Sequence, residues 1–311
     1  MSWIKRRIAF CRCCGTKDET SDRYRLYRIG IISDYHIGYQ YAAEHLSAAL
    51  NTLHNMGAEE IVTCGDTAVN GTESEWQSYI SIINQSPYSR AQIHECNGNH
   101  DGAAPDLAMF KQYSNNGALA DKKPYFTIAI HGDRYIFMAL DAGTSPASGD
   151  CFSTAQLDWL EAELNKYYDT GINVFLLEHS LFYGWGTGDI ISAPRYPRAL
   201  SLNYATNQRL KSILESHPNL IMLHGHSHIR LEDVSVGLVP YAPPTDAGCH
   251  QFHVPAISAG KYLTSSGEPA VDWSMPPECW VCDVYADKIV LTGIRADTGA
   301  AIKNMVYTIA R

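Results

Sequence analysis

Five stretches of the 311-residue sequence end in residues that could bind a metal ion or transfer a proton. Histidine offers a ring nitrogen, aspartate a carboxylate oxygen and asparagine an amide oxygen. Divalent manganese, iron and zinc accept this mixture of donors, whereas calcium prefers oxygen donors alone. The five sets, in chain order, are Asp34 with His36, Asp66, Asn99 with His100, His179, and His226 with His228.

Each of these sets follows an apolar run that predicts a strand. The runs cover residues 27–33, 60–64, 91–96, 172–178 and 220–224. Because the carboxyl ends of parallel strands gather at one edge of an α/β sheet, we expect the five sets to converge. The converging donors exceed what one tetrahedral ion needs, so we predict two metal ions that share a carboxylate.

The rest of the chain predicts further helices and strands. Apolar residues at helical spacing predict helices over 41–56, 73–83, 105–113 and 206–216, and another that begins at Ser153. The stretches 125–130 and 135–141 predict a hairpin around Gly132 and Asp133. Residues 281–285 and 289–294 predict a second strand pair. Without a repeat or a linker, we expect a basic leader over 1–24 and one α/β domain over 25–311.

Composition and charge limit the classes of function. Apolar residues make up 45% of the chain and charged residues 18%, which is typical of a globular protein. A net charge of −9 argues against a nucleic-acid partner. No apolar run approaches the roughly 20 residues that span a bilayer, and the leader lacks the apolar core of a signal peptide. The nine cysteines follow no regular spacing, so we expect reduced thiols and a cytoplasmic location. The oligomeric state is left open.

Two groups of cysteines could alternatively bind a metal ion. Cys11, Cys13 and Cys14 lie in the leader without a matching second ligand pair, which disfavours a metal site there. Cys279 and Cys282 lie three positions apart on a predicted strand, so their side chains should point to opposite faces. We therefore expect both to be structural.

The other histidines are expected to be ordinary core or surface residues. His250 and His253 differ from the rest because their loop could reach the predicted metal site. The set assigned to structural roles is His45, His54, His94, His131, His217, His224, His250 and His253.

The motif series resembles the calcineurin-like metallophosphoesterase superfamily. Gly65-Asp66, Gly98-Asn99-His100-Asp101 and Gly225-His226-Ser227-His228 occur in family order, with Asp34-x-His36 before them and His179 between the last two. The resemblance implies a four-layer α/β/β/α sandwich of two mixed sheets. It also implies one ion held by Asp34, His36, Asp66 and His228, and a second held by Asp66, Asn99, His179 and His226.

The resemblance further implies a mechanism for phosphoric ester hydrolysis. Hydroxide bridging the two ions (Mn, Fe or Zn) attacks phosphorus, His100 protonates the leaving group as general acid, and Asp101 orients His100. The spacings Asp34-x-His36-x-Gly38 and Asp66-x₄-Gly71 are most similar to the bacterial class III cyclic nucleotide phosphodiesterases. They imply a small phosphodiester substrate. Purple acid phosphatases carry a tyrosine ligand where this chain has Val69.

Several alternatives remain at this point. A phosphomonoesterase, a protein phosphatase, a nuclease or a catalytically silent scaffold would share the motifs. The acidic charge disfavours a nuclease, and the presence of His100 and of every ligand disfavours a scaffold. Residues of the 180–204 segment either contact substrate or pack that segment onto the domain. They are Phe182, Tyr183, Trp185, Arg195, Tyr196 and Arg198.

Overall fold

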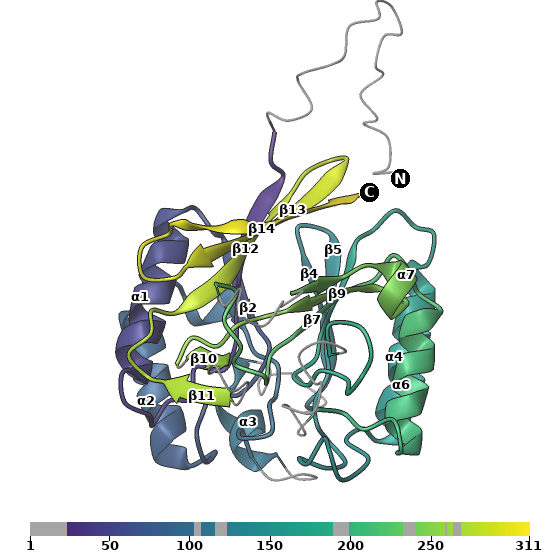
Figure 1. Ribbon diagram of the computed structural model, residues 1–311, viewed down its shortest axis with the longest axis horizontal. Helices are drawn as coiled ribbons and strands as arrows, with labels where there is room; N and C mark the ends of the chain where they lie inside the picture. Colours follow the sequence, from purple (N-terminus) through teal and green to yellow (C-terminus); the bar gives the residue numbers. More distant parts are fainter. Residues whose placement is uncertain are drawn as a thin grey trace, which may run out of the picture.

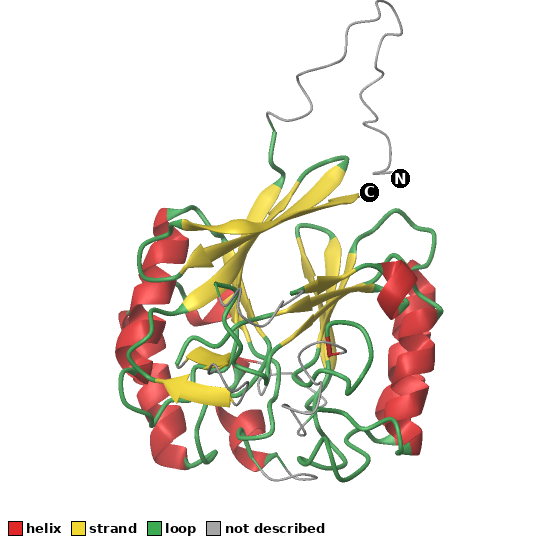
Figure 2. Ribbon diagram, in the orientation of Figure 1, coloured by secondary structure: helices red, strands yellow, loops and turns green. Residues whose placement is uncertain are grey.

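Two six-stranded mixed sheets face each other, and helices cover the outer face of each sheet (Figures 1 and 2). The computed structural model describes residues 24–102, 107–115, 123–188, 199–232, 240–258, 260–263 and 269–311. This arrangement is the four-layer α/β/β/α sandwich that the resemblance implies.

The first sheet has the strand order β14-β13-β12-β1-β2-β3. Strands β1, β2 and β3 run parallel, whereas β12, β13 and β14 extend the sheet in antiparallel fashion. Their bounds are β1 Tyr27–Ile32, β2 Glu60–Thr63, β3 Ile93–His94, β12 Glu278–Val284, β13 Lys288–Arg295 and β14 Ala301–Ala310.

The second sheet has the order β4-β5-β6-β7-β9-β8. Strands β5, β6, β7 and β9 run parallel, with β4 and β8 antiparallel at the two edges. The bounds are β4 Phe126–Ile130, β5 Asp133–Phe137, β6 Val174–Leu177, β7 Ile221–His224, β8 Tyr241–Ala242 and β9 His250–His253. A separate hairpin pairs β10 (Gly260–Leu263) with β11 (Pro269–Asp272).

The helices lie outside the two sheets, as the predicted apolar stripes require (Figure 1). On the first sheet these are α1 Ala42–Asn55, α2 Glu73–Gln85 and α3 Ala108–Tyr113; on the second they are α4 Thr154–Tyr167, α6 Ala205–Glu215 and α7 Pro244–Ala247. A capping box at Thr72 begins α2, and the Ser153 hydroxyl accepts a bond from the Gln156 amide at the start of α4.

Three apolar clusters hold the layers together. Phe137, Phe175 and Trp280 belong to the cluster between the two sheets. The second cluster includes Leu50 and Trp76 from α1 and α2 and packs them against the first sheet. The third includes Leu157 and Leu214 from α4 and α6 and packs them against the second sheet. Every layer therefore buries an apolar face on a neighbour, which fixes the strand ends relative to one another.

Two sequence predictions about strands can be checked directly. The strand predicted over 91–96 is shorter, because Arg90–Gln92 forms a 3-10 turn that the Gln92 side chain closes on Ser89. The prediction for Cys279 and Cys282 is confirmed. Cys279 lies in the helix-side cluster and Cys282 in the cluster between the sheets, both as free thiols.

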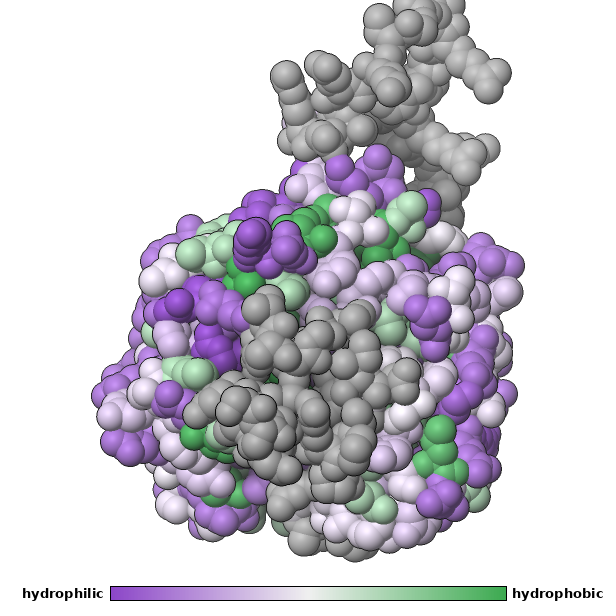
Figure 3. Space-filling view, in the orientation of Figure 1, coloured by the Kyte–Doolittle hydropathy of each residue, from purple (hydrophilic) through white to green (hydrophobic). Residues whose placement is uncertain are grey.

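The described surface is mainly hydrophilic on the face drawn in Figure 3, with apolar side chains in small groups. Within the described residues, no helix combines the length and apolar character needed to cross a membrane. Of the predicted leader, only Tyr24 falls within the described residues, so Cys11, Cys13 and Cys14 lie outside them.

Candidate metal centre

The predicted ligands lie where the parallel strands of both sheets end. Asp34 and His36 follow β1, and Asp66 follows β2. His179 follows β6, and His226 and His228 follow β7. Because the sheets face each other, donors from four strands of two sheets reach one place.

The first cluster joins Asp34, His36, Asp66 and His228, all buried. One potential ligand atom from each residue lies within 4.8 Å of the others. His228 Nε2 lies 3.0 Å from Asp34 Oδ1, and His36 Nε2 lies 3.4 Å from Asp66 Oδ2. The Nε2 atoms of His36 and His228 are 3.0 Å apart. This is the set that the resemblance implies for one ion.

The second cluster joins Asp66, His179 and His226 under the same distance limit. His179 Nε2 lies 3.2 Å from Asp66 Oδ2 and 3.0 Å from Asn99 Oδ1. His226 Nδ1 lies 3.1 Å from His179 Nε2. The structure thus brings Asn99 to the second predicted set, and Asp66 is common to both clusters.

The donor atoms of both clusters fit divalent ions. Two imidazole nitrogens at about 3 Å can share only one proton, whereas a cation between them accepts both lone pairs. Nitrogen and carboxylate donors in fours suit Mn, Fe or Zn better than calcium. The residues present therefore fit two divalent metal ions, with the Asp66 carboxylate between them.

The charge states of the site also favour a cation. Burial acts to raise the pKa values of Asp34 and Asp66, but the neighbouring histidines outweigh burial and hold both pKa values below the ordinary range. Burial, opposed by Asp66, lowers the pKa of His36 to about 3, which leaves this ring neutral and able to coordinate. The two carboxylates are therefore ionised and the His36 ring is neutral, which are the forms that bind a metal ion.

Hydrogen bonds from outside the clusters fix the direction of the ligands. The Ser33 hydroxyl donates to Asp34 Oδ2 at 2.5 Å, and the His226 amide donates to the same oxygen at 2.9 Å. His179 Nδ1 faces the Cys64 carbonyl at 2.7 Å, so its Nε2 points into the site. Such partners restrict ligand orientation before an ion arrives.

The backbone of the site is strained at the ligands themselves. Asp34, His36, Asp66, His226 and His228 all have positive φ, between 41° and 70°. This left-handed region is costly for residues with a Cβ and is concentrated at functional sites. These backbone conformations turn the chain sharply after each strand and point the ligand side chains toward the shared centre.

Glycines beside the ligands allow their close approach. A Cβ on Gly98 would lie 2.2 Å from Asp66 Oδ1, and a Cβ on Gly225 would lie 2.3 Å from Asp34 Oδ2. A Cβ on Gly65 would meet both the Gly98 backbone and His179 Nδ1 at 2.8 Å. Space therefore requires the glycine of each short motif, and Gly65 is also required by its φ of 94°.

His100 lies next to the first cluster without belonging to either one. Its amide donates to Asp66 Oδ1 at 2.8 Å, and its ring meets the edge of the His36 ring at 4.9 Å between centroids. Ring Nδ1 lies 2.5 Å from the Val69 carbonyl oxygen. A carbonyl accepts only from an N–H, so Nδ1 carries a proton and Nε2 is left for another partner.

The predicted contact of Asp101 with His100 is corrected by these distances. Asp101 Oδ1 accepts from the Ala68 amide at 3.0 Å, and Oδ2 accepts from the Gly98 amide at 2.8 Å. Asp101 thus holds the loop that carries His100, while the Val69 carbonyl orients the ring. This role of Val69 could not be predicted from the sequence, because a main-chain acceptor is independent of residue type.

Only some of the residues predicted to contact substrate fall within the described part of the chain. Trp185 packs against the cluster under α6, with Lys211 Nζ 4.8 Å over its ring. This position agrees with the packing alternative for Trp185. Tyr183 is exposed, and its role stays a prediction. Arg195, Tyr196 and Arg198 lie outside the described residues.

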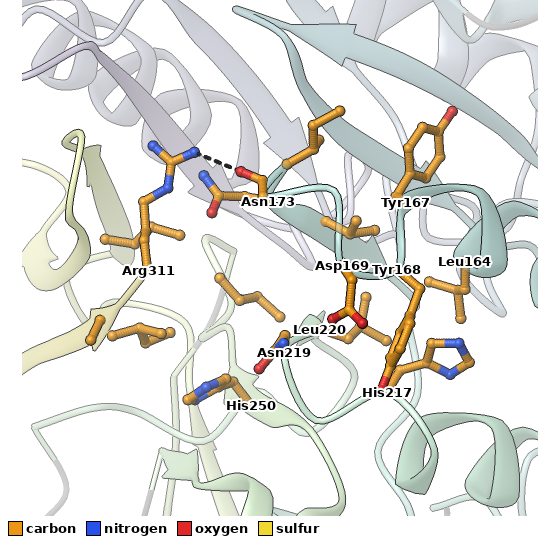
Figure 4. A pocket seen from close by; sticks show the side chains of 17 residues that line it. Leu164, Tyr167, Tyr168, Asp169, Asn173, His217, Asn219, Leu220, His250 and Arg311 are labelled. Carbon is orange, nitrogen blue, oxygen red and sulfur yellow. Dashed lines mark hydrogen bonds between the residues drawn. The ribbon is translucent and has the colours of Figure 1, made fainter. Parts of the chain in front are cut away.

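The doubtful histidines do not join the clusters within the described part of the chain. His253 Nε2 lies 2.9 Å from the Ile229 carbonyl oxygen, and His250 Nδ1 lies 2.8 Å from the Tyr241 hydroxyl. His250 instead lines a cavity of about 200 Å³ near the amino ends of β6 and β7 (Figure 4). Across that cavity, Arg311 donates to the Gly171 carbonyl. The cavity and the metal centre therefore lie at opposite ends of the strands.

Comparisons with known proteins agree with this geometry. Residues 27–230 match the family described as calcineurin-like phosphoesterase. A dimetal phosphatase from Danio rerio has a similar structure, with 14% identity, a TM-score of 0.60, and coverage of 92% of this chain and 99% of that one. No curated protein gives a significant sequence match.

Two further solved structures share the fold at a similar level. A purple acid phosphatase from yellow lupin (Lupinus luteus) has 12% identity and a TM-score of 0.58, covering 92% of this chain but 54% of that one. PhoD has 12% identity and a TM-score of 0.54, covering 93% of this chain and 69% of that one. This chain therefore spans about half of the lupin enzyme.

Proposed function

The chain belongs to the calcineurin-like phosphoesterase family, and we propose that this metal-dependent phosphoester hydrolase cleaves a small phosphodiester at its dimetal centre. One observation carries the proposal. Two buried donor clusters share Asp66, and the unligated His100 lies beside them. Shared-carboxylate sites with an adjacent proton donor suit in-line displacement at phosphorus.

The protein residues supply three functions in this reaction. Bound divalent ions would activate a water and neutralise charge on the phosphate oxygens. Asp66 sets the spacing of the two ion positions, because its carboxylate reaches His36 on one side and His179 on the other. His100 delivers the proton to the departing oxygen from Nε2, while the Val69 carbonyl holds Nδ1 and stabilises the charged ring.

The choice of a diester rests on the sequence spacing of two motifs. Gly38 and Gly71 both have positive φ, and a Cβ on Gly71 would meet the His100 carbonyl oxygen at 2.9 Å. These two glycines, which carry the resemblance to cyclic nucleotide phosphodiesterases, thus pack the segments that hold His36 and His100. A phosphomonoester is the second candidate, since two of the structural neighbours are named phosphatases.

A cytoplasmic location belongs to the same proposal. It is supported by the six cysteines that are free and buried among the described residues. Reduced buried thiols are typical of proteins in reducing compartments.

The first test is hydrolysis of bis-p-nitrophenyl phosphate and p-nitrophenyl phosphate by metal-stripped protein before and after addition of Mn²⁺. We expect metal-dependent release that is faster from the diester. Faster release from the monoester would reassign the protein as a phosphatase. Asp66→Asn keeps the size of the side chain and should abolish release from both esters. Metal-independent release, or equal release by this variant, would refute the proposal.

A further inference from the structure

Two aromatic residues beside the first cluster have no role in the proposed reaction. Tyr39 follows the ligand His36 by three positions, and its ring meets the His36 ring at 5.5 Å between centroids. The Tyr39 ring also contacts the ring of Trp273, with centroids 4.3 Å apart and planes tilted by 60°. The contacts form a continuous series of rings, from His100 through His36 and Tyr39 to Trp273.

The position of Tyr39 is fixed by the turn that carries it. Its amide donates to the His36 carbonyl at 3.1 Å, which closes a tight turn. Gly38 within this turn has a φ of 123°, and a Cβ there would lie 2.9 Å from Glu75 Oε1. The turn therefore sets the Tyr39 ring beside the ligand, although 38% of the surface of this residue remains exposed.

Trp273 precedes a segment that contacts Arg230, a residue close to the ligand His228. It follows β11, in a hairpin that Figure 1 shows below the first sheet on the side of α1 and α2. Arg230, two residues after the ligand His228, donates to the Pro276 carbonyl at 2.8 Å and pairs with the buried Glu278 carboxylate. Since His36 and His228 belong to one cluster, Tyr39 and the segment that follows Trp273 both adjoin ligands of the same ion position.

Tyr39 is exposed and Trp273 is partly buried, so aromatic surface that a ligand could cover remains beside the first cluster. Covering the exposed surface of an aromatic ring with another flat or apolar group is favourable, because it removes apolar area from water. The proposed proton donor His100 contacts His36 on the side from which the ring series begins. His36 lies between His100 and Tyr39 in this series, so a leaving group that is within reach of His100 and extends over His36 would meet the Tyr39 ring.

We propose that Tyr39 and Trp273 form an aromatic rim that selects phosphate esters whose leaving group carries a flat aromatic ring, either an aryl alcohol or a nucleoside. This inference rests on the proposed function. It assigns the two residues to specificity and not to bond cleavage. Stacking of one ring on an aromatic side chain is worth about 5-fold or more in affinity.

The test compares two esters whose leaving alcohols are similar in size, benzyl phosphate and cyclohexylmethyl phosphate, or their methyl diesters. Because benzyl alcohol is the stronger acid, the effect of the rim is the part of the preference that Tyr39→Leu removes. We expect the metal-loaded protein to prefer the benzyl ester by about 5-fold or more in kcat/KM. Tyr39→Leu and Trp273→Leu should each remove most of this preference through KM, and Tyr39→Phe should retain it. Tyr41→Leu is the matched control, because Tyr41 is similarly exposed and its ring contact is with His45.

Binding measurements separate this inference from the proposed function. Benzylphosphonate and cyclohexylmethylphosphonate resist hydrolysis, so calorimetric titration measures their affinities without turnover. Tighter binding of the benzyl compound that is lost in Tyr39→Leu supports the rim even if neither ester is cleaved. Equal binding of the two phosphonates would overturn the rim, whatever the hydrolysis assay shows.

A third ligand identifies the source of the ring. Adenosine 5′-monophosphate that binds at least as tightly as benzylphosphonate, and is weakened equally by Tyr39→Leu, would assign the rim to nucleobases. Weaker binding of the nucleotide with a retained benzyl preference would assign it to aryl alcohols. A nucleotide affinity that Tyr39→Leu leaves unchanged would remove nucleobases from the proposal.

Discussion

At the scale of single residues, the two oxygens of Asp66 have different partners. Oδ2 lies 3.4 Å from His36 Nε2 and 3.2 Å from His179 Nε2, so it faces both ion positions. Oδ1 accepts the amide of His100 at 2.8 Å. One carboxylate therefore connects the two ion positions to His100, the proposed proton donor.

His100→Ala should retain both metal ions and slow cleavage of esters with poor leaving groups by about 10²–10⁴-fold. Activated p-nitrophenyl esters should lose less, because their leaving group departs without a proton. The two rates and the metal content are measured together. His94→Ala, which removes a partly buried histidine paired with Glu60, is the control. Equal losses on both kinds of ester would exclude His100 as the acid.

Metal binding should release protons from His179. Burial lowers the pKa of His179, but the carboxylates of Asp66 and Asp34 outweigh burial and raise this pKa to about 10. The metal-free protein thus holds a proton at neutral pH that an ion must displace. Below that pKa, affinity should rise about tenfold per pH unit for each proton released. Calorimetry in buffers of different ionisation enthalpy counts the protons; an affinity independent of pH would contradict this charge state.

At the scale of elements, the turns after the strands position the site. After β1, β2 and β7, residues of positive φ and glycines turn the chain within a few positions of the strand end. Asp101 supports one of these turns through the amides of Ala68 and Gly98. The strands fix where the donors lie, and the turns fix the direction in which they point.

Gly98→Ala tests the requirement for close contact between the turns after β2 and β3. The added Cβ would lie 2.2 Å from Asp66 Oδ1, so the carboxylate must move. A displacement of this size should lower kcat by about 100-fold and weaken metal binding. Gly149→Ala is the control, because nothing lies within 4 Å of its added Cβ. Normal activity of Gly98→Ala would show that the turn can adjust.

At the scale of the whole molecule, the metal centre connects the two sheets. Asp34, His36 and Asp66 come from the first sheet, whereas His179, His226 and His228 come from the second. The sheets otherwise contact each other through the apolar cluster between them. Bound ions would therefore stabilise the folded state by linking two layers that are distant in sequence.

Removal of metal should lower the thermal stability of the protein. Each ion at 100 times its dissociation constant contributes about 2.7 kcal/mol, and each kcal/mol shifts Tm by about 2–4 °C in a domain of this kind. Two ions should thus raise Tm by about 10 °C or more. Calorimetric scans of chelator-treated and Mn²⁺-reloaded protein measure the shift. Asp66→Asn should show little shift, and a full shift in that variant would place the stabilising ions elsewhere.

The sequence alone determined the layers and the donor residues. Apolar runs and helical stripes predicted most elements, because burial on one face imposes a periodicity that can be counted. The donors were found because five predicted strands each end in Asp, Asn or His, and the carboxyl ends of parallel strands gather at one edge of a sheet. The family followed from the same residues and is confirmed by the match over 27–230.

Only the tertiary structure decided how these residues are connected. The Val69 carbonyl orients His100, and Asp101 bonds to backbone amides instead, because main-chain contacts depend on the path of the chain and not on residue type. The contact between Tyr39 and Trp273 joins positions 234 residues apart, so no local pattern could reveal it. Contacts of this kind are set by how the two sheets and their turns pack, which spacing in the sequence does not encode.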